Sequence, residues 1–241
     1  MKKRIVLGIE TSGETCRVAL LEVTGSPGTA AEILLKSVIT ERNYSGDASR
    51  HSEMLWSLLE GVLAGQGNPK SRREKKVMAP LSAVDLIAVS IGPGSFTGLR
   101  VGLATAKVFA HFGNIPLVGV PTMEAAAEDA SIRTGKREVL CALDARRGEV
   151  YASRFRRSGK FLRSSGGIRI CQMEEARRGL PEDVLVATEP PRAAVIAALG
   201  LARFVAGKRD DSRTLIPVYI RRPEAVERRL REVKRNKNIK K

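Results

Sequence analysis

The chain is poor in the residues on which many catalytic and metal sites depend. Its 241 residues include three cysteines, two histidines and one tryptophan, and aromatic residues make up only 4%. Cys16, Cys141 and Cys171 are odd in number and match no zinc spacing, which favours reduced, structural thiols. His51 and His111 lie far apart, so the chain has neither the His-Glu-x-x-His motif of a metalloprotease nor a Ser-His-Asp or Cys-His arrangement.

Long apolar runs are also missing. No run approaches the roughly 20 residues that a membrane-spanning helix requires. Residues 5–9, the first apolar run, are too short for the core of a signal peptide and instead predict a β-strand. We therefore expect a cytoplasmic protein without membrane contact, and its 43% hydrophobic content suits one large domain or two small lobes.

Positive charge is in excess. Lysine and arginine number 42 against 26 acidic residues, a net charge of +16. The excess gathers in residues 70–76, in residues 221–241 and in a third patch between residues 146 and 163. Such clusters attract phosphate backbones, although a solvated face is the favoured interpretation. With so few aromatic residues, a platform that stacks bases is not expected.

The pattern of apolar residues predicts alternating strands and helices. Strands are predicted over residues 4–10, 15–23, 31–39, 84–91 and 115–120, and helices over 52–63, 97–112 and 121–132. A polar linker is predicted over 66–82, a hairpin over 138–144 and 149–157, and a basic helix from Pro223. This order predicts an α/β layout whose later strands need parallel crossovers.

A glycine-rich turn, residues 91–100, joins a predicted strand to a predicted helix. Gly92 and Gly94 allow backbone angles closed to other residues, and Ser95 or Thr97 can cap the helix. The start of such a helix suits an anion, yet the turn lacks the Walker A lysine and the third glycine of the dinucleotide fingerprint. A phosphate cradle and a tight packing turn are both open interpretations.

Several short motifs occur in an order that resembles one protein family. They are Ile9-Glu10-Thr11-Ser12, His51-Ser52-Glu53, Gly92-Pro93-Gly94-Ser95-Phe96-Thr97-Gly98-Leu99-Arg100, Ala106-Lys107, Pro116-Leu117-Val118-Gly119-Val120, Asp144-Ala145-Arg146-Arg147-Gly148-Glu149-Val150-Tyr151 and Tyr219-Ile220-Arg221. Together they resemble the TsaB (YeaZ) family, a subunit of the bacterial machinery that makes threonylcarbamoyladenosine in tRNA. The resemblance implies an α/β fold of the actin/hexokinase-like (ASKHA, ribonuclease H-like) type. We expect an N-terminal lobe over 1–135, a smaller lobe over 136–222 and a basic tail over 223–241.

The catalytic paralogue TsaD shares part of this pattern but differs at its metal site. TsaD carries a His-x-x-x-His pair after the Pro-x-Val-Gly-Val strand, where this chain has Thr122 and Ala126. Threonine is a poor ligand and alanine is none. TsaD's later glycine-rich nucleotide motif is reduced to residues 166–168, for which a hairpin turn is the favoured interpretation. The resemblance therefore implies a subunit without catalysis or cofactor of its own, ATP and a metal ion belonging to the partners.

The resemblance also implies partners: TsaD as a heterodimer, the ATPase TsaE, and tRNA through the complex, with a homodimer of the isolated chain left open. Two predicted helices are candidates for the interface. Small residues recur every four positions in residues 97–112, and residues 52–63 have a broad apolar face. The candidate interface residues are Met54, Leu55, Leu58, Gly98, Gly102, Ala106 and Ala110. Deep burial in the chain's own core is the alternative interpretation of this broad apolar face.

Residual nucleotide contact is a second open question. Actin-like ATPases place a carboxylate after the first strand, near metal-bound phosphates, and Glu10 has that position here. The candidates for a vestigial phosphate loop are Glu10, Thr11, Gly92, Gly94 and Ser95. For Glu10 the favoured interpretation is a bond to the turn that follows it, and for residues 144–149 it is a charged structural turn rather than an anion site.

Two other functions compete with a scaffold subunit. An independent ATP-dependent phosphotransferase of the actin-like superfamily would need a second phosphate loop with an acidic residue in the second lobe, and the sequence shows none. A stand-alone RNA-binding protein would rest on the basic clusters alone. ATP turnover and tRNA binding by the isolated chain separate these alternatives.

Overall fold

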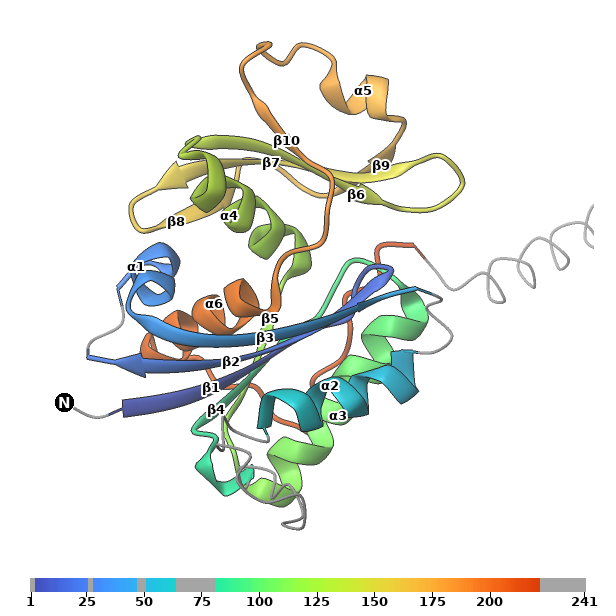
Figure 1. Cartoon of the computed structure of the whole chain (residues 1–241). Coiled ribbons are helices and arrows are strands. Elements are labelled where there is room, and N and C mark those ends of the chain that lie inside the picture. The colour runs from blue at the N-terminus through green and yellow to red at the C-terminus, as the bar shows by residue number, and fades with distance from the viewer. Residues whose placement is uncertain (1–2, 26–27, 47–50, 64–80, 222–241) are drawn as a thin grey trace, which may run out of the picture.

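The computed structural model describes residues 3–25, 28–46, 51–63 and 81–221, which form two lobes, each built on its own β-sheet (Figure 1). The basic cluster 70–76, the tail 223–241 and nearly all of the predicted linker 66–82 lie outside the described residues. None of the helices within the described ranges is long and apolar enough to cross a membrane.

The first sheet has five strands in the order β3-β2-β1-β4-β5. They are β1 (Lys3–Glu10), β2 (Thr15–Thr24), β3 (Ser37–Ser45), β4 (Leu86–Ser90) and β5 (Leu117–Val120). The first three are antiparallel, whereas β4 pairs in parallel with both β1 and β5. β4 is buried along its whole length, as its continuous apolar sequence predicts for a parallel strand covered on both faces. The predicted parallel crossovers are confirmed.

Helices cover both faces of this sheet. α2 (His51–Leu63) and α3 (Phe96–Gly113) pack on one face, and α1 (Ala30–Leu35) and α6 (Ala193–Val205) pack on the other (Figure 1). α3 begins where the Ser95 hydroxyl accepts a hydrogen bond from the Gly98 amide at 3.2 Å, and it ends at Asn114 in the left-handed conformation. The short 3-10 helix η2 (Leu81–Ala83) precedes β4.

The second sheet has the order β10-β6-β7-β8, and β9 also pairs with β7. Its strands are β6 (Glu138–Asp144), β7 (Val150–Ser158), β8 (Phe161–Ser164), β9 (Arg169–Cys171) and β10 (Leu185–Ala187). α4 (Thr122–Thr134) packs on one face and the short α5 (Met173–Arg177) on the other (Figure 1). The predicted hairpin is confirmed as β6 and β7. The predicted hairpin turn at residues 166–168 is wrong, because β8 and β9 each pair with β7 rather than with each other.

The strand predicted over residues 31–39 is also wrong. The chain first forms α1 and enters β3 only at Ser37. A capping box explains the helix: Thr29 Oγ1 accepts from the Glu32 amide at 3.1 Å, and Glu32 Oε2 accepts from the Thr29 amide at 2.9 Å. This local pair satisfies amides that the start of a helix leaves unbonded, and it outweighs the β-like pattern of apolar residues.

The predicted division into residues 1–135 and 136–222 fails at two helices. α4, expected in the first lobe, buries Met123 and Ala126 against the second sheet. α6, expected in the second lobe, returns to the first sheet, where residues 193–201 are all buried. The chain then stays with the first lobe, since the Asp210 amide bonds to Leu117 O and the Val218 amide to Ile91 O. A helix that is apolar all round indicates burial but not which sheet covers it.

Candidate functional site

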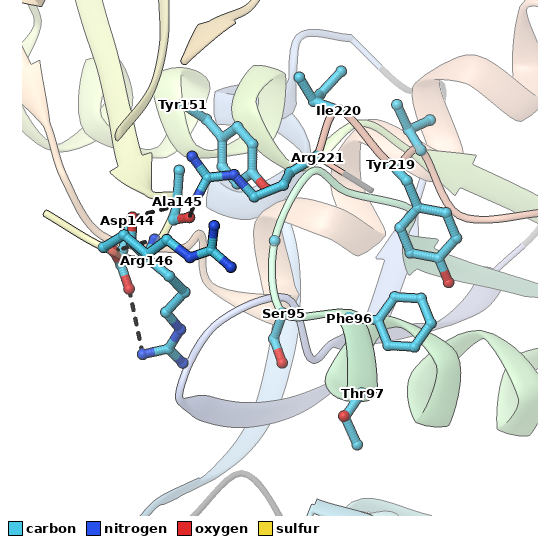
Figure 2. A pocket seen from close by; sticks show the side chains of 13 residues that line it. Ser95, Phe96, Thr97, Asp144, Ala145, Arg146, Tyr151, Tyr219, Ile220 and Arg221 are labelled. Atoms are coloured by element: carbon cyan, nitrogen blue, oxygen red, sulfur yellow. Dashed lines mark hydrogen bonds and ion pairs between the residues drawn. The ribbon is translucent and has the colours of Figure 1, made fainter. Parts of the chain in front are cut away.

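Two adjoining cavities, of about 240 Å³ and about 390 Å³, lie where the two lobes meet. The start of α3 and the turn between β6 and β7 line both cavities. Residues 218–221 complete the smaller one (Figure 2), and the turn between β1 and β2 and residues 188–190 complete the larger one. Figure 2 shows the Phe96 and Tyr219 rings side by side at one end, with centroids 5.0 Å apart. Of the candidate phosphate loop predicted from the sequence, Gly94 and Ser95 line this cleft.

The glycine-rich turn is packed tightly against its own chain. Gly92 has a φ of +101°, and a Cβ there would lie 2.7 Å from Val218 O. A Cβ at Gly94 would lie 2.4 Å from Ser12 O. The amides are used internally as well, since Ser95 N donates to Ser12 O at 2.6 Å and Gly92 N donates to Thr122 Oγ1 at 3.0 Å. Of the two interpretations, these contacts support the packing turn.

Glu10 is fully buried at the end of β1 and holds the turn that follows. Its Oε1 accepts from the Ser12 amide at 2.6 Å and from Ser12 Oγ at 2.5 Å, which confirms the favoured interpretation. Burial raises the pKa of Glu10, and the bonds from Ser12 oppose this only in part. Glu10 Oε2, Thr11 Oγ1 and Arg17 Nη1 are buried without a hydrogen-bond partner among the described residues. Neither Glu10 nor Thr11 lines the two cavities.

Carboxylates accompany two arginines of the cleft, Arg146 and Arg221. Arg146 Nη1 lies 3.1 Å from Glu14 Oε1, across the gap between the lobes, and 3.4 Å from Asp144 Oδ2. Arg221 donates to Ala145 O at 2.7 Å and pairs with Glu149, and Figure 2 shows it reaching over the turn between β6 and β7. Arg146 and Arg221 therefore already have acidic or carbonyl partners, whereas Arg17, which also lines the larger cavity, keeps the Nη1 that has no partner in the described part of the chain.

The turn between β6 and β7 has an unusual backbone. Arg146, Arg147 and Gly148 follow one another with φ values of +65°, +62° and +74°. A non-glycine residue in this region costs on the order of 1 kcal/mol or more. The turn is closed by the Ala145 amide donating to Glu149 O at 2.9 Å. These contacts support the structural interpretation of residues 144–149.

The position of TsaD's histidine pair is occupied by packing residues. Thr122 and Ala126 are both buried on α4, and the Thr122 hydroxyl accepts from the Gly92 amide. Across the described ranges, no three His, Cys, Asp or Glu side chains come together in a way that could hold a metal ion.

The predicted interface residues lie mostly inside the chain. Gly98, Gly102, Ala106 and Ala110 are buried, and a Cβ at Gly102 would lie 2.2 Å from Thr11 Oγ1. Leu55 and Leu58 share the core beneath α2 and α3, while Met54 is half-buried. The prediction that this stripe and these leucines form a partner surface is therefore wrong. The bare backbone of α3 admits the chain after β1 rather than a helix of another protein.

The opposite side of α2 and α3 exposes large apolar side chains that are not among the predicted interface residues. Trp56 and Val108 are 50% exposed and Phe112 is 82% exposed. The Trp56 ring meets Phe109 edge to face, with centroids 6.4 Å apart. We call Trp56, Val108, Phe109 and Phe112 the outer α2–α3 face. The available signal was the pair Val108 and Phe112, four positions apart and off the small-residue stripe.

Comparisons with known proteins agree with this architecture. The family model described as TsaD, tRNA N6-adenosine threonylcarbamoyltransferase, matches residues 75–207. The TsaB proteins of Escherichia coli K12 and Haemophilus influenzae are 29% identical over 152 residues and 28% identical over 191 residues. The chain belongs to the TsaB (YeaZ) family. These matches cover 63% and 76% of the chain, and the chain spans 55% and 70% of the two relatives' lengths.

Solved structures show the same fold. YeaZ from Pseudomonas aeruginosa superposes with a TM-score of 0.70 at 22% identity, covering 90% of this chain and 100% of that one. A second structure from that species, described as similar to peptidase YEAZ, gives 0.68 at 24% identity with the same coverage. The predicted actin-like α/β fold is confirmed. At such identities the likeness concerns the fold alone.

Proposed function

We propose that the chain is a non-catalytic subunit in the biosynthesis of threonylcarbamoyladenosine in tRNA. In this role it pairs with TsaD, alongside TsaE, and supports transfer of threonylcarbamoyl from an adenylate to the adenosine beside the anticodon. The relatives from E. coli and H. influenzae, both named as tRNA threonylcarbamoyladenosine biosynthesis proteins, support the pathway. ATP and a metal ion belong to the partner subunits in this proposal.

The contents of the cleft support a non-catalytic role. The Gly92 and Ser95 amides of the glycine turn donate to oxygens of the chain itself, and the Glu10 carboxylate accepts from the turn after β1 rather than facing the cavity. Thr122 and Ala126 stand where TsaD is expected to hold its metal. An independent phosphotransferase would need the opposite: free amides in the glycine turn and a carboxylate at the Glu10 position that faces the cleft.

The outer α2–α3 face is the observation that best supports the proposed pairing with TsaD. A contiguous set of exposed large apolar side chains on one pair of helices is characteristic of an interaction surface, whereas single exposed apolar residues are ordinary. Trp56, Val108 and Phe112 are at least half exposed, and aromatic anchors of this kind dominate the binding energy of protein interfaces. In the absence of TsaD, the same face could hold a second copy of the chain.

Reconstitution tests the proposal. The chain is mixed with TsaD and TsaE of the same organism, a tRNA transcript and threonylcarbamoyl-adenylate, and the modified nucleoside is measured by mass spectrometry. We expect modification to require both the chain and TsaD, and the chain alone to turn over no ATP. Equal modification without the chain would contradict the proposed role, and ATP turnover by the chain alone would favour the phosphotransferase alternative.

A further inference from the structure

A third cavity lies in the second lobe, on the face of the sheet that carries α5. Its volume is about 360 Å³, and it is bordered by β7, the bend between β8 and β9, and the residues after α5. Three arginines line it from three separate elements: Arg154 of β7, Arg169 of β9 and Arg178 at the end of α5. We call this cavity the arginine pocket.

The arginine pocket differs from the interlobe cleft in its charge balance. No acidic side chain is among the described residues that line it. Arg154 pairs with Glu138, which also pairs with Arg156. Arg169 and Arg178 are exposed, and their guanidinium groups make no ion pair or hydrogen bond with any part of the chain that the structure describes. Two of the three cations are therefore free for an anion, whereas Arg146 and Arg221 in the cleft are not.

The shape of the pocket suits a phosphate group. Gly166, Gly167 and Gly179 form part of its wall, and a Cβ at any of them would meet nothing within 4 Å. Ser165 is fixed beside them, with its hydroxyl donating to Arg154 O at 3.1 Å. A guanidinium group can bind two phosphate oxygens at once through parallel hydrogen bonds, and it does so best where no carboxylate competes.

The lining also indicates which part of a nucleic acid would bind. No aromatic side chain is among the residues that the structure places in the wall, so bases have no surface on which to stack. Contacts from arginine to the backbone position a nucleic acid without reading its sequence. An RNA strand would therefore meet this pocket through its phosphodiester groups.

We propose that the arginine pocket binds a backbone phosphate of tRNA, so that the second lobe holds the substrate while the first lobe holds TsaD. The proposal rests on the proposed function for the identity of the RNA. It assigns the two lobes surfaces of different chemistry: the first lobe has the apolar outer α2–α3 face, and the second lobe has a pocket with unpaired positive charge.

The test compares neighbouring arginines that differ only in their relation to the pocket. Binding of an unmodified tRNA transcript to the full chain is followed by fluorescence anisotropy over a series of salt concentrations. Arg178→Gln removes a cation from the pocket, and Arg177→Gln makes the same charge change at an exposed position that does not line it. Gly167→Glu adds a carboxylate to the wall, at a position where added atoms meet no neighbour.

We expect Arg178→Gln to weaken binding roughly tenfold at low salt and to reduce the slope of log affinity against log salt by about 1. Gly167→Glu should weaken binding at least as much, with an unchanged circular-dichroism spectrum. Arg177→Gln should leave the slope close to that of the wild type. Any RNA sequence of equal length should show the same losses, because the contact is to the backbone.

Three results would overturn the proposal. Equal losses in Arg177→Gln and Arg178→Gln would show diffuse attraction rather than a site. Inorganic phosphate that binds the wild type but not Arg178→Gln, without any change in RNA affinity, would mark a site for small anions. No RNA binding by the wild type at about 50 mM salt would also overturn it. These measurements need no modification activity, so their failure leaves the pairing with TsaD untouched.

Discussion

The two faces of α3 are built from side chains of opposite size. The inner face presents Gly98, Gly102, Ala106 and Ala110, all buried, whereas the outer face presents Val108 and Phe112 to solvent. Small residues lie where the chain's own backbone passes close to the helix, and large apolar residues lie where no part of the described chain covers it. The inner side of the helix thus serves close internal packing, and the outer side is the one that the proposed partner would contact.

Gly102→Leu should give the largest effect, because it forces a side chain into the inner face. A Cβ alone would lie 2.2 Å from the buried Thr11 Oγ1, and the remaining atoms of leucine have no space. We expect a loss of roughly 3 kcal/mol or more in the free energy of unfolding, measured by urea denaturation. Failure to yield soluble protein would agree with the same account.

The matched control is Ala104→Leu, which enlarges an exposed residue on the same helix. It should change the free energy of unfolding by no more than about 0.5 kcal/mol. If Gly102→Leu proves as stable as Ala104→Leu, the small-residue stripe must lie at the surface, and this would contradict the account of the two faces.

Glu10→Gln tests the buried side of the comparison through the pH dependence of the free energy of unfolding. The pKa of Glu10 in the folded chain is raised by burial above its ordinary value of 4.5, so the folded state keeps a proton that the unfolded state has lost. The wild type should therefore lose stability as pH rises from 4.5 toward the folded pKa, and be most stable, as far as this group is concerned, below 4.5. Glutamine can still accept from the Ser12 amide but does not ionise. Urea midpoints measured between pH 4 and pH 8 should thus fall less steeply for the variant, and parallel curves would contradict the prediction.

Much of the first lobe could be predicted from the sequence. β4 followed by a glycine turn and α3 is visible as an apolar run, two glycines and a helical repeat of small residues. The bond from Glu10 to Ser12 was expected from the position of a carboxylate just before a turn. Local patterns of this kind depend on neighbouring residues, and the sequence displays them directly.

The remaining features depend on contacts between distant residues. A glycine such as Gly102 indicates that something approaches the helix, but the same bare backbone fits either Thr11 or a partner protein. α6 lies more than a hundred residues from β4 along the chain, and only the fold shows that they pack together. The arginine pocket likewise joins Arg154, Arg169 and Arg178, whose spacing follows no motif.

A negative charge introduced on the outer α2–α3 face tests the central claim, the proposed pairing with TsaD through α2 and α3, most directly. Phe112→Glu should change the free energy of unfolding by about 0.5 kcal/mol at most, since Phe112 is 82% exposed. Leu35→Glu, at an 86% exposed position on α1, which covers the opposite face of the first sheet, is the matched control. On size-exclusion chromatography with TsaD, we predict that the wild type and Leu35→Glu co-elute with TsaD and that Phe112→Glu does not. Co-elution of Phe112→Glu as complete as that of Leu35→Glu would contradict the account.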